Sequence, residues 1–145
     1  LPLRIREHCR NADAVTEYLN RHDQVARVIH PSLQGGVDRA RADTYLQGGY
    51  GGLVGVELKG GLAAGRHFIE ALELFYHVAN IGDARSLAIH PATTTHSQLT
   101  PEEQLATGVT EGYVRLSIGI EHIDDIIADL AQALDRAATA VKAAA

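Results

Sequence analysis

The 145-residue sequence has no tryptophan, no methionine and a single cysteine, and its formal net charge is -5 at pH 7. One cysteine cannot form a disulfide within the chain, which favours a reducing compartment, and we expect the cytoplasm. The 13 basic residues are scattered, unlike the clustered charge of a nucleic-acid-binding protein. No apolar run approaches the length that spans a bilayer. The composition therefore argues against nucleic-acid and membrane partners.

The sequence is also poor in the residues that carry common enzymatic chemistry. Its two lysines are Lys59, beside a glycine pair, and Lys142, in the alanine-rich tail, and neither position suggests a buried, reactive amine. The Gly-x-Ser-x-Gly motif of serine hydrolases is missing. His90 and His96 lie six residues apart, but no His-x-x-x-His or paired-cysteine spacing occurs. We therefore expect neither a hydrolase nucleophile nor a metal site.

Hydrophobic residues make up 46% of the chain, enough for the core of one domain over residues 1–145. The spacing of the apolar residues predicts an alternation of helices and strands. Helices are expected over residues 2–21, 38–46 and 62–78, from Thr100 and from Ile123, and strands over residues 24–29, 53–58, 86–89 and 113–118. This order predicts an α/β fold of the two-layer α+β kind. Its sheet would have four strands with mixed or mostly antiparallel pairing, and helices would cover one face.

Two positions carry sharper structural expectations. Thr100, followed by Pro101 and by Glu103 three residues on, is typical of a helix N-terminus with a capping box. Cys9 lies at helical spacing from apolar neighbours, so we expect a small core residue rather than a reactive thiol.

Arg115 is the most informative single residue. It lies within a strand whose other face is apolar, where a guanidinium without an anionic partner is costly. Two interpretations are open: an ion pair with Asp or Glu on a neighbouring element, or a bound carboxylate or phosphate held by two parallel hydrogen bonds. Asn80 and Thr95 lie in polar loops and are able to donate hydrogen bonds to such a ligand. They also suit an Asx-turn and a loop-stabilising hydroxyl.

Four ordered segments carry a resemblance to a known family. HPATTTH at 90–96, GV at 108–109, VRLSIGIE at 114–121 and DDIIADL at 124–130 occur at the family's separations. Together they resemble the C-terminal domain of the Cys/Met-metabolism family, which comprises fold-type-I enzymes dependent on pyridoxal 5'-phosphate (PLP). The resemblance runs over essentially the whole chain from Leu1 onward.

Within this family, NIGDARSL at 80–87 and TTTHSQL at 93–99 look most like the O-acetylhomoserine sulfhydrylases. The resemblance implies replacement of the acetoxy group of O-acetyl-L-homoserine by sulfide, giving L-homocysteine for methionine and cysteine biosynthesis. Alternatives are the C-terminal domain of a methionine γ-lyase or of a cystathionine γ-synthase. A non-catalytic amino-acid-binding or dimerisation module is also compatible.

The resemblance assigns substrate-binding roles to four residues. The arginine that binds the substrate α-carboxylate falls on Arg115. The position that also touches this carboxylate falls on Asn80, where many relatives have serine, so the backbone of Asn80 is expected to matter more than its amide. The active-site threonine falls on Thr95. Ala79 falls where relatives vary with the reaction, and its small side chain is expected to leave room beside the γ-carbon.

The chain departs from the family pattern in one large respect. The family's Schiff-base lysine and other PLP-binding residues belong to a preceding domain, and no catalytic or cofactor-binding residue is assigned here. The chain starts with Leu1 rather than Met, which suits a fragment. With the preceding domain missing, the resemblance implies the C-terminal piece of an enzyme of roughly 430 residues. The piece alone is expected to be inactive, and the whole enzyme is expected to form homodimers or homotetramers.

Overall fold

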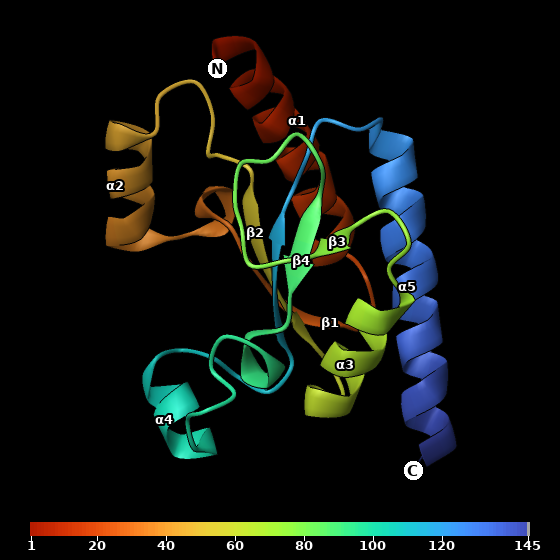
Figure 1. Cartoon of the computed structure of the whole chain (residues 1–145). Coiled ribbons are helices and arrows are strands. Elements are labelled where there is room, and N and C mark those ends of the chain that lie inside the picture. The colour runs from red at the N-terminus through yellow and green to blue at the C-terminus, as the bar shows by residue number, and fades with distance from the viewer. Residues whose placement is uncertain (145) are drawn as a thin grey trace.

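The computed structural model describes residues 1–144 as alternating helices and strands (Figure 1). The helices are α1 (Pro2–Asn20), η1 (Pro31–Leu33), α2 (Gly36–Tyr45), α3 (Gly61–Ala71), η2 (Pro91–Thr93), α4 (Pro101–Ala106) and α5 (Ile123–Ala144). The strands are β1 (Val25–Ile29), β2 (Leu53–Leu58), β3 (Tyr76–His77), β4 (Leu87–Ile89) and β5 (Tyr113–Ser117). Within these residues, no helix combines the length and apolar character needed to cross a membrane.

The strands form one mixed sheet in the order β1-β2-β5-β4-β3. Its first four strands pair antiparallel, and β3 joins β4 in parallel at the edge. Because side chains alternate along a strand, β2 and β5 direct one set of residues to each face. The buried set comprises Val54, Val56, Val114 and Leu116.

Helices α1, α3 and α5 cover this apolar face (Figure 1). Each contributes a stripe of side chains at helical spacing, as an amphipathic helix on a sheet must. The largest fully buried residues of the helical layer are Leu19, Phe68, Ile126, Leu130 and Leu134. The two-layer α/β fold with helices on one face is confirmed.

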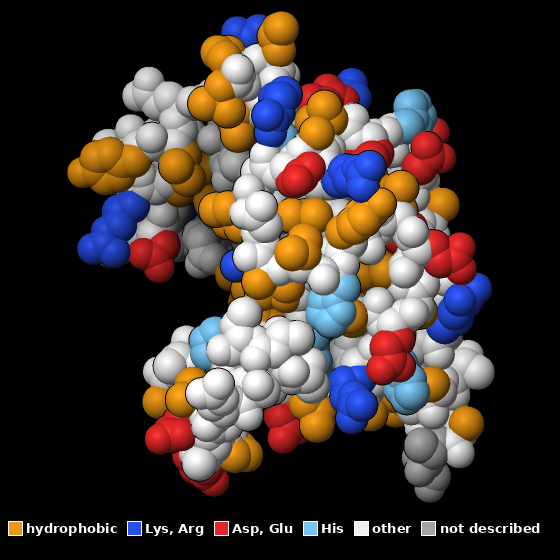
Figure 2. Space-filling view, in the orientation of Figure 1, with side chains coloured by type: hydrophobic (Ala, Val, Ile, Leu, Met, Phe, Trp, Pro, Cys, Tyr) orange, Lys and Arg blue, Asp and Glu red, His pale blue; other side chains and the backbone are white. Residues whose placement is uncertain are grey.

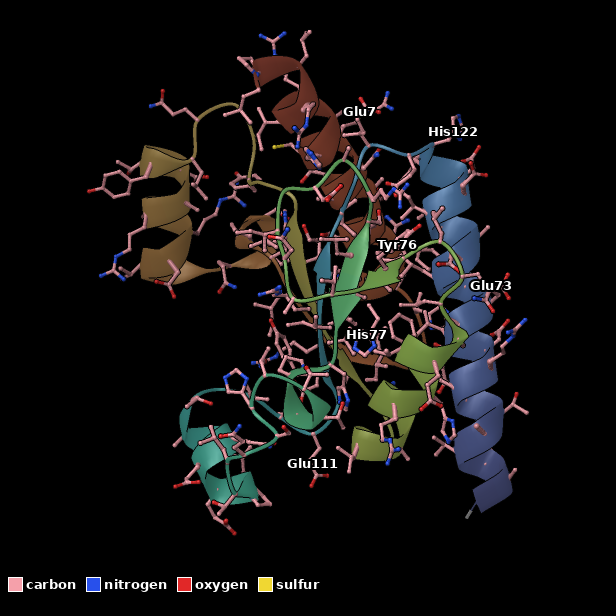
Figure 3. All side chains as sticks on the ribbon, in the orientation of Figure 1. Glu7, Glu73, Tyr76, His77, Glu111 and His122 are labelled. Atoms are coloured by element: carbon pink, nitrogen blue, oxygen red, sulfur yellow. The ribbon has the colours of Figure 1, made fainter. Side chains whose placement is uncertain are left out.

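Two expectations about the elements are wrong. The helix expected over residues 62–78 ends at Ala71, and the sheet has five strands rather than four. Both errors have one cause: the chain turns after α3, and Tyr76 and His77 then form the edge strand β3 (Figure 3). The carboxylate of Asp129 on α5 accepts hydrogen bonds from the backbone N–H groups of residues 73–75, so these amides are satisfied outside a helix.

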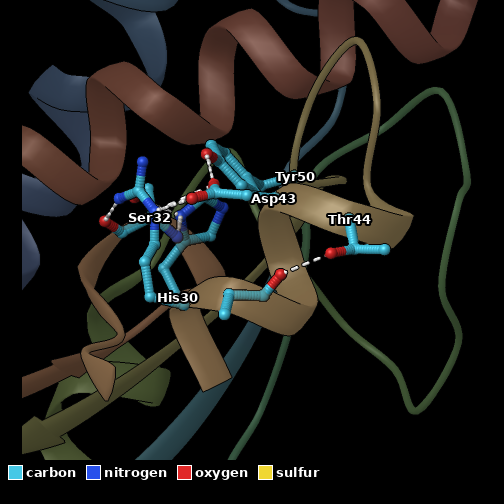
Figure 4. Close-up of polar contacts among 7 residues, drawn as sticks. His30, Ser32, Asp43, Thr44 and Tyr50 are labelled. Carbon is cyan, nitrogen blue, oxygen red and sulfur yellow. Dashed lines mark hydrogen bonds and ion pairs between the residues drawn. The ribbon is translucent and has the colours of Figure 1, made fainter. Parts of the chain in front are cut away.

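Polar contacts rather than core packing hold α2, in which only Ala42 is buried. Arg39 on this helix donates to the carboxylate of Asp43 and, over 3.1 Å, to the carbonyl of Ser32 (Figure 4). The hydroxyl of Tyr50 donates to Asp43, and the Tyr50 ring lies edge-on to the His30 ring. The helix therefore stands beside the sheet rather than on it.

The helix-start and cysteine expectations are both confirmed. Thr100 and Glu103 form a reciprocal capping box at the start of α4. Cys9 is buried on α1, and the side-chain-free Gly49 lies against its sulfur.

Candidate functional site

The face of the sheet opposite the helical layer carries the candidate site. On β5 the alternation that buries Val114 and Leu116 places Arg115 on this opposite face. Its partners across the sheet are Gly55 on β2 and Ile89 on β4. Figure 2 shows the molecule hollowed between the projecting helices α2 and α4. The site is therefore an open surface rather than a closed cavity.

Within residues 1–144 the guanidinium of Arg115 makes one hydrogen bond, from its Nη2 to the carbonyl oxygen of Asn80 over 3.1 Å. No Asp or Glu carboxylate within residues 1–144 lies at ion-pair distance from this guanidinium. The ion pairs of this part of the chain involve other arginines, among them Arg27, Arg39 and Arg136. The interpretation of Arg115 as part of a structural salt bridge is therefore not supported by the described residues.

Tyr113 and Gly55 form the surroundings of Arg115 on the same face. A Cβ on Gly55 would lie 2.8 Å from the Tyr113 ring, so the ring occupies the space that a side chain would take. Burial raises the pKa of the Tyr113 hydroxyl, and the positive charge of Arg115 acts in the opposite direction. The phenol is therefore neutral near pH 7 and offers Arg115 no anionic partner.

Asn80 presents its backbone, not its side chain, to Arg115. Its Oδ1 accepts a hydrogen bond from the N–H of Ile81 over 2.9 Å, so the side chain is occupied within its own turn. Ala79 precedes it, exposed and without a bulky side chain. The structure thus brings Arg115 and Asn80 into contact through the Asn80 carbonyl.

Thr95 lies in the turns that follow η2. Its hydroxyl is exposed and is 2.9 Å from Nδ1 of the neighbouring His96. Within the described part of the chain, no hydrogen bond links Thr95 to Arg115 or to Asn80. Its assignment to the site remains a prediction.

Two residues that the sequence analysis did not single out, Arg4 and Ser117, contact the loop that carries Asn80. The N–H of Gly82 donates to Oγ of Ser117 over 3.1 Å, and the carbonyl of Gly82 accepts from Nη2 of Arg4 over 2.5 Å. Ser117 is two residues from Arg115, so its presence on the same face follows from the strand alternation. Arg4 is 78 residues from Gly82, and no local pattern reveals that contact.

The candidate site offers a cation and hydrogen-bond donors. Lys59 and Lys142 are exposed. In residues 1–144 no group of three or more His, Cys, Asp or Glu side chains is arranged to hold a metal ion. The arrangement is suited to binding an anionic group, above all a carboxylate, which matches the planar donors of a guanidinium.

Comparison with known proteins identifies the class of protein that has this fold. The family model described as "Cys/Met metabolism PLP-dependent enzyme" matches residues 1–135. The chain belongs to this family of PLP-dependent enzymes.

Among its relatives, the chain is 52% identical over 135 residues to the O-acetyl-L-homoserine sulfhydrylase of Leptospira meyeri, covering 92% of this chain and 30% of that protein. It is 48% identical over 135 residues to the homocysteine synthase of Schizosaccharomyces pombe, covering 93% of this chain and 32% of that protein. It is 46% identical over 138 residues to the L-methionine gamma-lyase of Pseudomonas putida, covering 95% of this chain and 34% of that protein.

The fold has a close counterpart among solved structures. A putative O-acetylhomoserine (thiol)-lyase from Campylobacter jejuni, which contains a pyridoxyl-lysine phosphate, superposes with a TM-score of 0.85 at 40% identity. The match covers 92% of this chain and 32% of that chain. The chain therefore spans about a third of the length of the relatives it matches.

Proposed function

We propose that this chain is the C-terminal, substrate-binding domain, residues 1–145, of a PLP-dependent O-acetylhomoserine sulfhydrylase. The longer enzyme would replace the acetate of O-acetyl-L-homoserine with sulfide, giving L-homocysteine and acetate in methionine and cysteine biosynthesis. The observation that carries the proposal is Arg115: it lies on the open face of the sheet, contacts one carbonyl and has no carboxylate partner within residues 1–144.

In this proposal Arg115 binds the α-carboxylate of the substrate. One hydrogen bond to the Asn80 carbonyl leaves the other N–H groups of the guanidinium available for two parallel bonds to a carboxylate. Fixing the carboxylate fixes the orientation of the substrate, which contributes to catalysis by positioning. Asn80 would act mainly through its backbone, Thr95 through its hydroxyl, and Ala79 by leaving space beside the γ-carbon.

The residues of this chain do not by themselves fit PLP. Covalent attachment of the cofactor needs an enclosed amine, whereas Lys59 and Lys142 are both exposed. We therefore propose that a preceding domain of the longer protein binds the cofactor and that this chain contributes substrate orientation only. We further propose a cytoplasmic homodimer or homotetramer.

A second candidate activity is γ-elimination from L-methionine. The 46% identity to the Pseudomonas putida L-methionine gamma-lyase supports this second candidate. The 52% and 48% identities to a sulfhydrylase and a homocysteine synthase favour the first proposal. Turnover of O-acetyl-L-homoserine with sulfide and of L-methionine alone, measured on the full-length enzyme, separates the two. Efficient release of methanethiol with no homocysteine formation would overturn the sulfhydrylase proposal.

The role of Arg115 is tested by Arg115→Ala in the full-length enzyme. A hydrogen-bonded ion pair with a substrate is worth about 1.5–3 kcal/mol, so KM for O-acetyl-L-homoserine should rise about tenfold to a hundredfold. The melting temperature should stay near the wild-type value, because no ion pair of the described chain is broken. Arg27→Ala is the control, since Arg27 is also a strand arginine but is exposed and pairs with Glu57. Unchanged kinetics of Arg115→Ala would contradict the carboxylate-binding role.

A further inference from the structure

The loop that carries Ala79 and Asn80 has no buried anchor. Every residue from Tyr76 to Arg85 is exposed, and the apolar side chains among them include Val78 at 47% and Ile81 at 56% relative exposure. Apolar burial, the usual force that fixes a segment, is therefore limited in this loop. The position of the Asn80 carbonyl beside Arg115 then depends largely on polar contacts.

The exit of this loop is fixed by a buried hydrogen-bond cluster around Ser86. The carboxylate of Glu121 accepts from the N–H of Ser86 over 2.6 Å and from its hydroxyl over 2.9 Å. The same hydroxyl accepts from the N–H of Gly119 over 2.9 Å. The two ends of the loop also contact each other: the guanidinium of Arg85, at its end, lies 4.6 Å from the centre of the ring of Tyr76, at its start. The two ends of the loop are thus fixed, and the middle of the loop needs contacts of its own to hold its position.

The middle is held at Gly82 from two sides. Ser117 on β5 accepts from the Gly82 N–H, and Arg4 on α1 donates to the Gly82 carbonyl. Gly82 has a φ of +70°, a left-handed conformation that glycine adopts without strain. Ser117 is buried within the sheet, so its hydroxyl is a fixed point, whereas Arg4 is exposed. We name these three residues, Arg4, Gly82 and Ser117, the Gly82 clamp.

The clamp and the candidate site share the same strand face. Ser117 is two residues from Arg115, and Gly82 is two residues from Asn80, so β5 and the loop are joined at two successive points. Loss of the clamp would let the Asn80 carbonyl move away from Arg115. The guanidinium would then lose the one hydrogen bond that it makes within residues 1–144.

We propose that Arg4 and Ser117 are positioning residues for substrate binding. By clamping Gly82 they hold the Asn80 carbonyl against one N–H of Arg115 and so aim the remaining donors at the substrate α-carboxylate. This inference rests on the proposed function, and it adds to that function two residues that never touch the substrate.

The test uses Arg4→Ala and Ser117→Ala in the full-length enzyme. Losing one orienting hydrogen bond should raise KM for O-acetyl-L-homoserine about fivefold, with kcat changed less than about twofold. Arg4→Lys keeps a cationic donor and should restore most of the loss. Matched controls are Arg21→Ala, at the other end of α1, and Thr139→Ala, which removes an exposed hydroxyl of α5; both should behave as wild type. Because Arg4 is exposed, its variants keep the test valid even if Ser117→Ala folds poorly.

A second readout separates positioning from a general structural role. L-Homoserine carries the α-carboxylate, whereas 3-aminopropan-1-ol is the same amine alcohol without it. Inhibition by L-homoserine should weaken about fivefold in Arg4→Ala, while inhibition by 3-aminopropan-1-ol should not change. Equal weakening of both inhibitors would overturn the positioning role.

The outcomes also distinguish this inference from the proposed function. If Arg115→Ala raises KM but both clamp variants match wild type, the clamp proposal is wrong and the proposed function stands. If Arg115→Ala itself leaves KM unchanged, both proposals fall.

Discussion

At the scale of single residues, His90 shows how an enclosed side chain constrains its neighbours. Its Nε2 lies 2.7 Å from the carbonyl of Glu111, which only accepts, so Nε2 carries the hydrogen, and Nδ1 is 3.0 Å from the Thr93 hydroxyl. Gly65 has no side chain because a Cβ there would overlap the imidazole. Burial lowers the pKa of His90; the Glu111 carbonyl opposes this shift, and the charges of Arg66 and His77 add to it (Figure 3).

This environment predicts a pH dependence of stability. Because the folded-state pKa of His90 lies below the unfolded value near 6.5, the unfolded chain binds a proton that the folded chain does not. The contribution of His90 to the free energy of unfolding should therefore be constant above about pH 7.5 and fall below pH 6.5, by at most about 1.4 kcal/mol per pH unit. Burial also lowers the pKa of His30, so His30 should add to the same loss of stability at low pH.

Urea unfolding at pH 7.5 and pH 5.5 measures this difference. His90→Gln should reduce the pH dependence, whereas His122→Gln, which alters an exposed histidine, should not. An equally steep dependence in His90→Gln would show that His90 does not contribute.

The contacts of a single residue could be predicted from the sequence only where its partners are close along the chain. Thr100 and Glu103 lie in one helical turn, and their capping box was predicted. Arg115 was recognisable because alternation along a strand assigns its face, although the two interpretations of its partner stayed open. Arg4 was not recognisable, since its contact with Gly82 depends on tertiary packing.

At the scale of elements, the end of α3 depends on a side chain from another helix. The apolar spacing of the sequence continues past Ala71, which is why a longer helix was predicted. Asp129 of α5 instead accepts from the backbone N–H groups of Glu73 and Leu74 over 2.9 Å each, and from that of Phe75 over 3.3 Å. Periodicity within one segment contains no information about a carboxylate some 55 residues away.

Removing this carboxylate should therefore loosen the turn and the edge strand that follows it. We expect Asp129→Ala to lower the free energy of unfolding by about 2–3 kcal/mol, because amide groups are left without their acceptor in a partly buried turn. Asp129→Asn keeps one acceptor oxygen and should cost less. Asp135→Ala, at an exposed position of the same helix, is the matched control for urea unfolding. A loss no larger than that of the control would contradict this account of the turn.

At the scale of the whole molecule, the fold class was predictable because amphipathic spacing in each segment defines one buried face. The strand order could not be predicted, because strands pair with partners that are distant in the sequence. β5 lies between β2 and β4 although it is the last strand along the chain. For the candidate site, the local pattern and the family resemblance pointed to Arg115 and Asn80, which are in contact. The arrangement of Thr95 relative to them stays a prediction.

The chain taken alone should have no sulfhydrylase activity. We expect the 145-residue polypeptide, mixed with PLP, O-acetyl-L-homoserine and sulfide, to form no homocysteine, because its exposed lysines provide no enclosed attachment site. Mass spectrometry after borohydride reduction should find no lysine stoichiometrically modified by PLP. The full-length enzyme is the positive control, and stoichiometric labelling of Lys59 or Lys142 would contradict this expectation.

The enclosure of Cys9 has a practical consequence for spectroscopy. The one thiol of the chain is buried on α1 under the loop of Gly49, and tryptophan is absent. A cysteine introduced at an exposed position such as Ala79 would thus be the one accessible thiol for a maleimide dye among the described residues. An introduced tryptophan would likewise fluoresce without background, so the loop beside Arg115 is open to direct optical observation.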